Sequence, residues 1–438
     1  MGFNLETGGS SSSRSSGYQS SSTDSTSQQY GLVGNHPYRC LSVLPDHEGH
    51  VFSIALATDQ MLYSGSDCGE LRASQWPSTE VIDALGATQN SQFGSGKGSV
   101  KAMVVVGNKV FTAHQDQKIR VWKRAGSSKR VTNISHKLVS TLPTVKDYVM
   151  TYITPKSSVQ VRRHKKALWI DHHDTISVLA MGKGVLYSGS WDKTIKVWRI
   201  SDLKCIESIT AHIDAVNALA VDLSRGFLYS GSADGTVKVW ERSRTPGLKS
   251  TTRHSAVATL APSKNQSVNA LALSQDGTIC YAGSSDKGIA VWQTHDEGTG
   301  KHMINMGTLR GHRLAVLCLT SVSNLLVSGS ADKTIRVWRR NPGEELNHQC
   351  LAVLQGHSRP VKCLAAVIEP LGEAMMVYSG SMDRSVRVWW LSLVDHDGES
   401  AGDAPSSPDV SAFLTPNESP FQELFQASLE PGFRARLQ

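Results

Sequence analysis

The stretch Leu228-Tyr-Ser-Gly-Ser-Ala-Asp-Gly-Thr-Val-Lys-Val-Trp240 contains two short strand-like runs on either side of Asp234-Gly235. The first run ends in Ser230-Gly-Ser232, and the second alternates polar and apolar residues up to Trp240. Asp-Gly between two such runs is the strongest short-range signal for a β-hairpin, because glycine adopts the positive φ of a tight turn at little cost. The stretch therefore predicts one β-hairpin.

Six further parts of the chain carry the same pattern. Clear copies end at Trp198, Trp338 and Trp389, and looser copies end at Trp122 and Trp292. A seventh copy has Cys68 and Ser74 where the others carry Asp and Trp. In the six copies with Trp, an Asp lies six residues before it, and a Ser, Thr or Ala lies ten residues before it. Fixed internal offsets that recur every 42 to 76 residues indicate a repeat architecture.

Another strand is predicted upstream of each hairpin, and in five copies a His lies four residues before its first Val or Ile. These residues are His47, His172, His212, His312 and His357, whereas Gly96 and Lys264 occupy the position in the second and fifth copies. A His and a strand, followed by Ser-Gly-Ser-x-Asp and a strand ending in Val-Trp, resembles the WD40 repeat. Seven copies cover residues 36–392. The resemblance implies an all-β, seven-bladed WD40 β-propeller, in which each blade is a four-stranded antiparallel sheet beside a central channel.

The last repeat has no outer strand after Trp389. Residues 38–44 form a strand-like run before the first repeat, and Cys350–Leu354 occupies the matching place before the seventh. We therefore expect residues 38–44 to complete the seventh blade, which would remove open sheet edges.

Four repeats carry the residue types of a Ser-His-Asp triad together with a Trp. The family resemblance implies structural tetrads, in which a buried Trp N–H reaches a hydroxyl and His joins that hydroxyl to Asp. A hydrolase is the alternative, but one catalytic site does not need four copies, so we expect a structural role. The residues concerned are His172, Ser188, Asp192 and Trp198; His212, Ser230, Asp234 and Trp240; His312, Ser328, Asp332 and Trp338; and His357, Ser379, Asp383 and Trp389. Departures at Gly96, Lys264, Ala282, Cys68 and Ser74 argue against full tetrads in the first, second and fifth blades.

The position just before each hairpin Asp is a turn position on the usual recognition face of the family. Trp191, Met382 and Gln115 are the large residues at this position. Asp174, Asp214 and Arg359, each two residues after the lead-in His, should lie near the same rim. We expect these six residues to contact a protein partner, with an exposed Trp as the best anchor. The alternative is that each caps its own loop.

An insertion at about 137–166 separates the second and third repeats. It contains the basic run Arg162, Arg163, Lys165 and Lys166, which is typical of a nuclear-import signal or a nucleic-acid contact and is equally compatible with a solvated loop. Tyr148, Met150 and Tyr152 have the spacing of a strand, so part of the insertion is predicted to pack against the propeller.

Charge is unevenly distributed. The whole chain carries +7, residues 395–438 carry −6 and residues 1–35 carry −1, so residues 36–394 carry +14. We expect the Ser-rich residues 1–35 and the acidic, Pro-containing residues 393–438 to be disordered tails. Within the second tail, the apolar spacing of residues 420–429 predicts a short helix that folds only when docked.

The seven cysteines are scattered without Cys-x-x-Cys spacing, which favours a reducing compartment over a disulfide or zinc framework. No run approaches 18 apolar residues, and no phosphate-binding loop or metal-ligand motif is present in the sequence. We therefore expect no cofactor, no metal and no membrane span, and a propeller that is a monomer.

Within the WD40 proteins the chain resembles the plant Jingubang-like group. The resemblance is carried by His36-Pro-Tyr-Arg-Cys-Leu-Ser-Val-Leu44, by Leu142-Pro-Thr144, Val161-Arg-Arg163 and Leu168-Trp-Ile170 in and beside the insertion, and by Val388-Trp-Trp390. It implies a plant regulator in the nucleus and cytoplasm that acts through protein partners, transcription regulators among them, with pollen germination and tube growth as its setting. We expect a non-catalytic scaffold; the alternative is a propeller whose basic surface binds nucleic acid, which steep salt dependence of binding would reveal.

Overall fold

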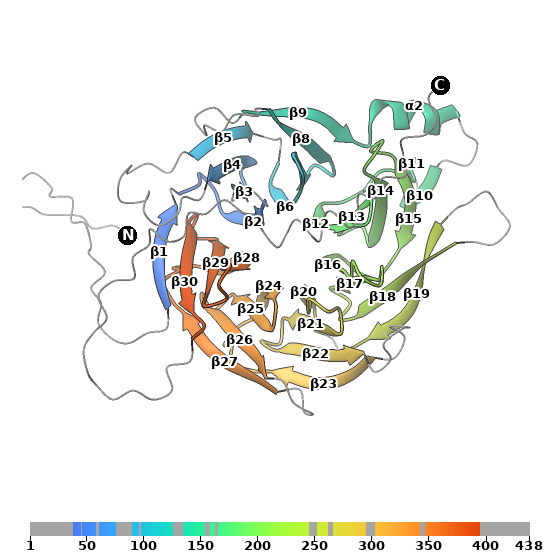
Figure 1. Cartoon of the computed structure of the whole chain (residues 1–438). Coiled ribbons are helices and arrows are strands. Elements are labelled where there is room, and N and C mark those ends of the chain that lie inside the picture. Colours follow the sequence, from blue (N-terminus) through green and yellow to red (C-terminus); the bar gives the residue numbers. More distant parts are fainter. Residues whose placement is uncertain are drawn as a thin grey trace, which may run out of the picture. The chain divides into compact units, whose positions relative to one another are not determined.

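The computed structural model describes residues 38–44, 46–57, 61–75, 90–95, 98–125, 135–153, 158–162, 165–244, 252–261, 266–294, 303–341 and 347–394. These residues form seven four-stranded antiparallel sheets, the blades, arranged as a ring (Figure 1). The innermost strands of blades 1 to 7 are β2 (Val51–Leu56), β6 (Val100–Val106), β12 (Ile176–Gly182), β16 (Val216–Val221), β20 (Val268–Leu273), β24 (Val316–Val322) and β28 (Val361–Ile368). Each contacts the next in this order, and β28 contacts β2. The fold is therefore the closed seven-bladed propeller that the sequence predicts.

Three more strands follow outward in each blade. The second strands are β3 (Met61–Ser66), β7 (Lys109–His114), β13 (Val185–Ser190), β17 (Leu228–Ser232), β21 (Ile279–Ser284), β25 (Leu325–Ser330) and β29 (Ala374–Ser381). The third strands are β4 (Glu70–Gln75), β8 (Ile119–Ala125), β14 (Thr194–Arg199), β18 (Val237–Arg244), β22 (Ile289–Thr294), β26 (Ile335–Asn341) and β30 (Val386–Ser392). The outer strands are β5 (Asn90–Ser95), β9 (Ser135–Leu142), β15 (Cys205–Thr210), β19 (Thr252–Leu260), β23 (Met303–Leu309), β27 (Asn347–Leu354) and, for blade 7, β1 (Tyr38–Leu44).

The predicted closure of blade 7 is confirmed. β1 pairs antiparallel with β30, from Tyr38 opposite Leu391 to Leu44 opposite Val386. The first described strand of the chain thus completes the last blade. This pairing supplies hydrogen-bond partners to an edge that would otherwise be open to other chains.

The glycine of the Ser-Gly-Ser motif allows neighbouring blades to pack closely. A Cβ atom added at Gly231 would lie 2.6 Å from Cγ1 of Val268 in the next blade, and one at Gly380 would lie 2.7 Å from Cγ1 of Val51. Both valines are fully buried and begin an inner strand. The motif is therefore required by the packing of one blade on the next, and the hydrophobic cores accordingly lie between blades.

Tyrosine–histidine pairs join blades 1 and 2, blades 3 and 4, and blades 5 and 6. In each pair the tyrosine hydroxyl lies on the second strand of the first blade and hydrogen-bonds the histidine Nε2 on the outer strand of the next. The pairs are Tyr63 and His136 (3.1 Å), Tyr187 and His254 (3.0 Å), and Tyr281 and His348 (2.9 Å). Every second blade interface among these six blades therefore has the same polar contact.

The insertion differs from the sequence prediction in two ways. Residues 137–142 belong to β9, so the segment outside the blades begins after Leu142. The residues predicted as a strand from Tyr148 to Tyr152 lie instead in the helix α2 (Val145–Ile153). The cause is a capping box: Asp147 N donates to Thr144 Oγ1 over 3.2 Å, and Thr144 N donates to Asp147 Oδ2 over 2.9 Å.

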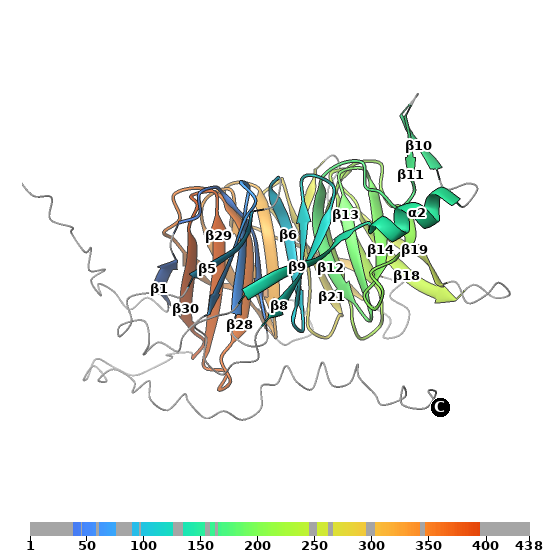
Figure 2. The same cartoon turned by 90° about the horizontal axis from the view of Figure 1, so that it is seen from above.

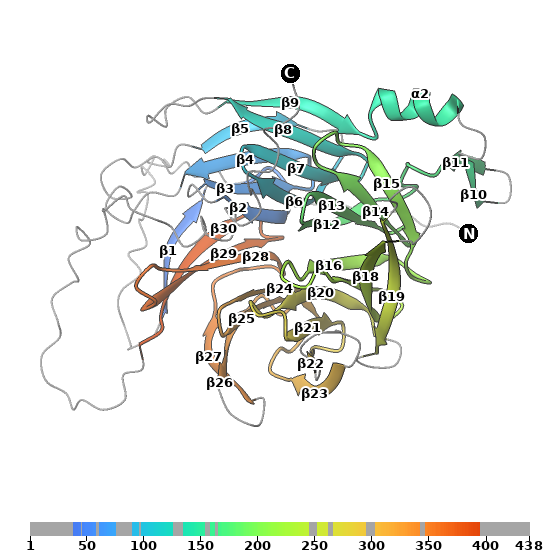
Figure 3. The same cartoon turned by 45° about the vertical axis from the view of Figure 1, so that its right-hand side comes forward.

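After α2, strands β10 (Ser158–Arg162) and β11 (Lys165–Leu168) form an antiparallel hairpin. Figures 2 and 3 show α2 and this hairpin outside the ring of blades, with the hairpin extending beyond one end of the blades in Figure 2. Among the described residues, neither α2 nor any other helix is long and apolar enough to cross a membrane. The tails 1–35 and 395–438, with the predicted helix 420–429, lie outside the described residues, as does Arg163.

Candidate functional site

One edge of every blade carries both the hairpin turn and the loop that leads into the inner strand. A backbone hydrogen bond joins them: Trp191 N donates to Thr175 O in blade 3 and Met382 N donates to Pro360 O in blade 7, both over 3.0 Å. Equivalent bonds occur in the other five blades. We call the end of the ring formed by these seven edges the turn face, and the other end the opposite face.

The four predicted tetrads lie just beneath the turn face, in blades 3, 4, 6 and 7. In blade 3, Trp198 Nε1 donates to Ser188 Oγ over 2.9 Å, while His172 joins Ser188 Oγ at 2.8 Å to Asp192 Oδ2 at 2.9 Å. The other three sets repeat these contacts within 2.7–3.0 Å: His212, Ser230, Asp234 and Trp240; His312, Ser328, Asp332 and Trp338; and His357, Ser379, Asp383 and Trp389.

Protonation states in the tetrads follow from burial and hydrogen bonding. Burial lowers the pKa of His172 below its ordinary value, although the hydrogen bond and charge of Asp192 oppose that effect. Burial alone would raise the pKa of Asp192, but hydrogen bonds from His172 and Thr194 hold it well below its ordinary value. The carboxylate is therefore ionised and fixes the imidazole, which leaves Nε2 to contact the serine hydroxyl.

Blades 1 and 2 contain partial networks that use residues absent from the tetrad pattern. In blade 1, His47 bonds Ser64 Oγ at 2.7 Å and Glu70 Oε2 at 2.9 Å, so Glu70 supplies the carboxylate that Cys68 cannot. In blade 2, His114 on the second strand bonds Thr112 Oγ1 at 2.8 Å. Trp122 Nε1 donates to the same oxygen over 2.9 Å.

Sequence reasoning did not identify Glu70 or His114 as members of these networks. Glu70 stands two residues after the missing Asp, and His114 two residues after Thr112. These short offsets from the repeat positions are the sequence signals by which the two residues can be recognised as network members. In blade 5, Ala282 takes the place of the hydroxyl, and the described residues form no equivalent network there.

The serine oxygens of the four tetrads are inaccessible to a substrate. All four serines are 0% exposed: Ser188, Ser230, Ser328 and Ser379. A serine that acts as a nucleophile must be reachable by its substrate. The described part of the chain also contains no cluster of three or more side chains suited to a metal ion. The geometry of the tetrads supports blade packing and leaves the surface of the turn face as the candidate site.

The six predicted partner-binding residues all lie on the turn face, with different degrees of exposure. Trp191 has 43% of its surface exposed, and Gln115 and Arg359 are also exposed, whereas Met382 is partly buried. Asp174 and Asp214 are exposed, but each also accepts a hydrogen bond from the next backbone N–H, at Thr175 and Ala215. These two acids thus cap their own loops while remaining accessible.

Two further apolar side chains are exposed in the loops that lead into the inner strands, and sequence reasoning missed both. Ile213 is 82% exposed and directly follows His212. Leu314 is 49% exposed and lies two residues after His312. A large apolar residue next to a lead-in His was the available signal, since loops that only connect strands are usually polar. With Trp191 they are three large apolar side chains exposed in the blade turns and lead-in loops of the turn face.

The insertion also belongs to the turn face, because it connects the end of β9 to the loop that leads into β12. Its helix is held by Tyr148, whose hydroxyl donates to Asp171 Oδ1 and accepts from Lys118 Nζ, both at 2.5 Å. Lys118 lies in the hairpin turn of blade 2 and Asp171 at the start of the loop into blade 3. In the basic run, Arg162 ends β10, and Lys165 and Lys166 begin β11.

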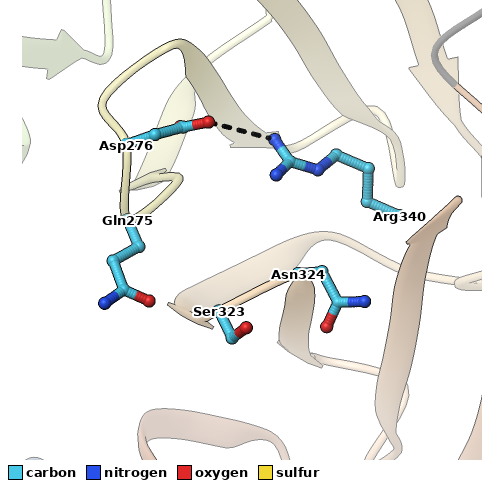
Figure 4. A pocket seen from close by; sticks show the side chains of 5 residues that line it. All are labelled: Gln275, Asp276, Ser323, Asn324 and Arg340. Atoms are coloured by element: carbon cyan, nitrogen blue, oxygen red, sulfur yellow. Dashed lines mark ion pairs between the residues drawn. The ribbon is translucent and has the colours of Figure 1, made fainter. Parts of the chain in front are cut away.

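The opposite face contains an open recess between blades 5 and 6 (Figure 4). Its lining is polar: Gln275, Asp276, Ser323, Asn324 and Arg340. Figure 4 shows the guanidinium of Arg340 directed at Asp276, and the charged atoms are 3.7 Å apart. The pair joins two blades, and the residues that line the recess include no apolar side chain, so it is a weaker candidate site than the turn face.

Comparison with known proteins agrees with this architecture. The family model "WD domain, G-beta repeat" (WD40) matches residues 165–199, 203–241, 254–293, 304–339 and 348–389. Among solved structures, the crystal structure of the WD40 β-propeller domain of Doa1 is similar, with a TM-score of 0.57 and 20% sequence identity. The similarity covers 80% of this chain and 96% of that one, and at this identity it shows the fold alone. No curated protein matches the chain.

Each of the five matched segments contains the three inner strands of one of blades 3 to 7, and the family model matches neither blade 1 nor blade 2, whose networks use other residues. Their four-stranded sheets and their place in the ring are nevertheless the same as those of the matched blades. The chain is a WD40-repeat protein with a seven-bladed β-propeller fold.

Proposed function

We propose that this protein is a non-catalytic scaffold that binds other proteins through its turn face. WD40 propellers are generally protein–protein interaction scaffolds. The observation that carries the proposal for this chain is the exposure of Trp191, Ile213 and Leu314 on one face of the ring. Exposed aromatic and aliphatic side chains of this size are typical anchors of protein interfaces, because their burial on binding is favourable.

The resemblance to the plant Jingubang-like group supports a more specific proposal. We infer a plant regulator that acts in the nucleus and cytoplasm, with transcription regulators among its partners and pollen germination and tube growth as its setting. The support is the sequence of β1 and of the segments around Pro143, Arg162 and Trp390. Detection of the tagged protein in nuclei and cytoplasm of pollen tubes, and altered germination when it is depleted, would test this proposal.

The experiment that tests the scaffold proposal is affinity capture from plant cell extract. Three forms of the full chain are compared: the intact protein, Trp191→Ala with Ile213→Ala, and a control with Leu223→Ala and Leu371→Ala. The control leucines are 50% and 68% exposed and lie on the opposite face. All three forms must first melt at the same temperature.

We expect the intact protein and the control to retain a shared set of proteins that the Trp191 and Ile213 variant loses. Identical sets from all three forms would contradict binding at these anchors. Nucleic-acid binding is the second candidate, supported by the charge of +14 on residues 36–394. It predicts that affinity for duplex DNA falls steeply with salt, whereas an interface anchored by Trp191 would change little.

A further inference from the structure

Two lysines at the inner edge of the turn face flank a single phenylalanine. Phe52, Lys101 and Lys362 are the second residues of β2, β6 and β28, the inner strands of blades 1, 2 and 7. The residue before each of them pairs with the last residue of a second strand, next to a hairpin turn, so all three lie near the turn face. Because β2 contacts both β6 and β28, ring closure brings together residues that are 310 positions apart in the sequence.

The positive charge of Lys101 lies in an unfavourable environment. Lys101 Nζ lies 4.1 Å from the centre of the Phe52 ring and is partly buried. Burial lowers the pKa of Lys101, and the positive charge of Lys362 lowers it further. Asp67 opposes this effect, but its Oδ1 accepts a hydrogen bond from His50 N over 2.8 Å. Within the described residues neither lysine has an ion-pair partner.

The surrounding part of the turn face is also basic. The loops and turns of blades 6 and 7 expose four cations, for which the described residues provide no acidic partner: Arg313, Lys333, Arg359 and Arg384. The acids in those two turns, Asp332 and Asp383, are hydrogen-bonded to the tetrad histidines. A hydrogen bond from His47 N to Arg384 O holds the blade 7 turn against the loop into blade 1.

We propose that Lys101 and Lys362, on either side of Phe52, bind the carboxylates of an acidic peptide segment in a partner protein. This inference rests on the proposed scaffold function and specifies the chemistry of the partner. An ammonium group over an aromatic ring, with a second lysine on the inner strand at the other side, suits a short acidic segment with an apolar residue, because the ring offers contact area and the lysines offer charge. The four cations of blades 6 and 7 extend the positive potential along which such a segment would approach.

A protein segment fits this face better than a nucleic acid does. The turn face also exposes Asp46, Glu48, Asp174 and Asp214, in blades 1, 3 and 4. A duplex presents uniform negative charge at close spacing and would be repelled by these acids. A partner protein can place an acidic segment at the lysines and other residues opposite the acids.

The test uses a fluorescein-labelled peptide of eight glutamates and the full-length protein, with binding followed by fluorescence anisotropy at low salt. The critical variant is Lys101→Gln with Lys362→Gln. The matched control is Lys183→Gln with Lys204→Gln, which removes the same charge from exposed lysines on the opposite face. A Lys101→Arg, Lys362→Arg form keeps the charge in place.

We expect the dissociation constant of the peptide to rise at least tenfold in the critical variant, and to change less than threefold in the control and the arginine form. The melting temperature of the critical variant should not fall, because the substitution removes two like charges. Equal peptide affinity in the critical variant and the control would overturn the proposal. Binding of labelled duplex DNA through these lysines, without binding of the peptide, would also overturn it.

The scaffold proposal is tested separately. Its capture experiment alters Trp191 and Ile213 and leaves Lys101 and Lys362 unchanged. Loss of captured proteins there, together with unchanged peptide binding in the critical variant, would leave the scaffold function standing and remove only the acidic-segment inference.

Discussion

Replacing Thr112 with valine should destabilise blade 2 by breaking two hydrogen bonds while keeping the side-chain shape. Thr112 is 0% exposed, and its hydroxyl contacts both Trp122 Nε1 and His114 Nε2. Burial lowers the pKa of His114 to about 4, so its ring is neutral and its Nε2 can accept the threonine proton, with Nδ1 facing Gly98 O at 3.4 Å. Valine satisfies neither the indole N–H nor the imidazole nitrogen.

The size of the effect follows from the number of buried polar groups that lose a partner. Each stranded group costs about 1–3 kcal/mol, so two of them should lower the free energy of unfolding of blade 2 by about 2–6 kcal/mol. Because about 1.4 kcal/mol corresponds to a tenfold change, amide hydrogen exchange in β7 and β8 should accelerate by about 30- to 20,000-fold.

The assay is native-state hydrogen exchange of the full chain, followed by mass spectrometry of peptides that cover β7 and β8. Thr112→Ser keeps the hydroxyl and should retain most of the protection. Thr308→Val provides the matched control, because Thr308 is an exposed threonine on β23 and its replacement should change stability by less than about 0.5 kcal/mol. Protection in Thr112→Val equal to that in Thr308→Val would refute the reasoning.

Three further predictions concern blade closure, pH and the insertion. Deleting residues 1–44 removes β1 and exposes the edge of β30, so the shortened chain should associate into oligomers that light scattering detects; a stable monomer would contradict the role given to β1. Burial, reinforced by a nearby arginine, lowers the pKa of His136 and of His348 to about 4 from 6.5, so the unfolded chain binds these protons first as pH falls. The free energy of unfolding measured in urea titrations should therefore be highest above pH 6.5 and decline towards pH 4. Changing both histidines to glutamine should make that decline smaller. Tyr148→Phe removes the hydroxyl that bonds Asp171, so limited proteolysis should cut residues 145–168 faster, while peptides from the blades remain protected; unchanged cleavage would show that other contacts hold α2.

The ring could be predicted from the sequence because each blade is encoded locally. The hairpin turn, the Trp and the Ser-Gly-Ser motif recur at fixed offsets, and the strand at 38–44 has the character of a missing outer strand. The spacing of Tyr148, Met150 and Tyr152 predicts a strand, whereas the capping box that starts at Thr144 begins the helix α2 at this place. Local signals at a helix start outweigh the spacing of a few large side chains.

The candidate site was only partly predictable, for a geometric reason. Trp191 could be found because its turn position is fixed by its own repeat. The contact between Lys101 and Phe52, and the nearness of Lys362, arise where blades 1, 2 and 7 meet, and no spacing along the chain shows this. The same holds for His114, which acts from a strand where the other blades use a loop residue.

The pairing of Tyr38 with Leu391 also fixes where the propeller joins the rest of the chain. β1 runs towards the turn face and β30 runs away from it, so the first residue of one strand and the last residues of the other lie side by side at the opposite face. A domain fused directly before Tyr38 or directly after Ser392 would therefore be attached at the opposite face, and the turn face would stay clear. Joining the two ends by a short linker and reopening the chain in the Gly107-Asn108 turn, on that same rear face, would give a circular permutant with the same recognition surface.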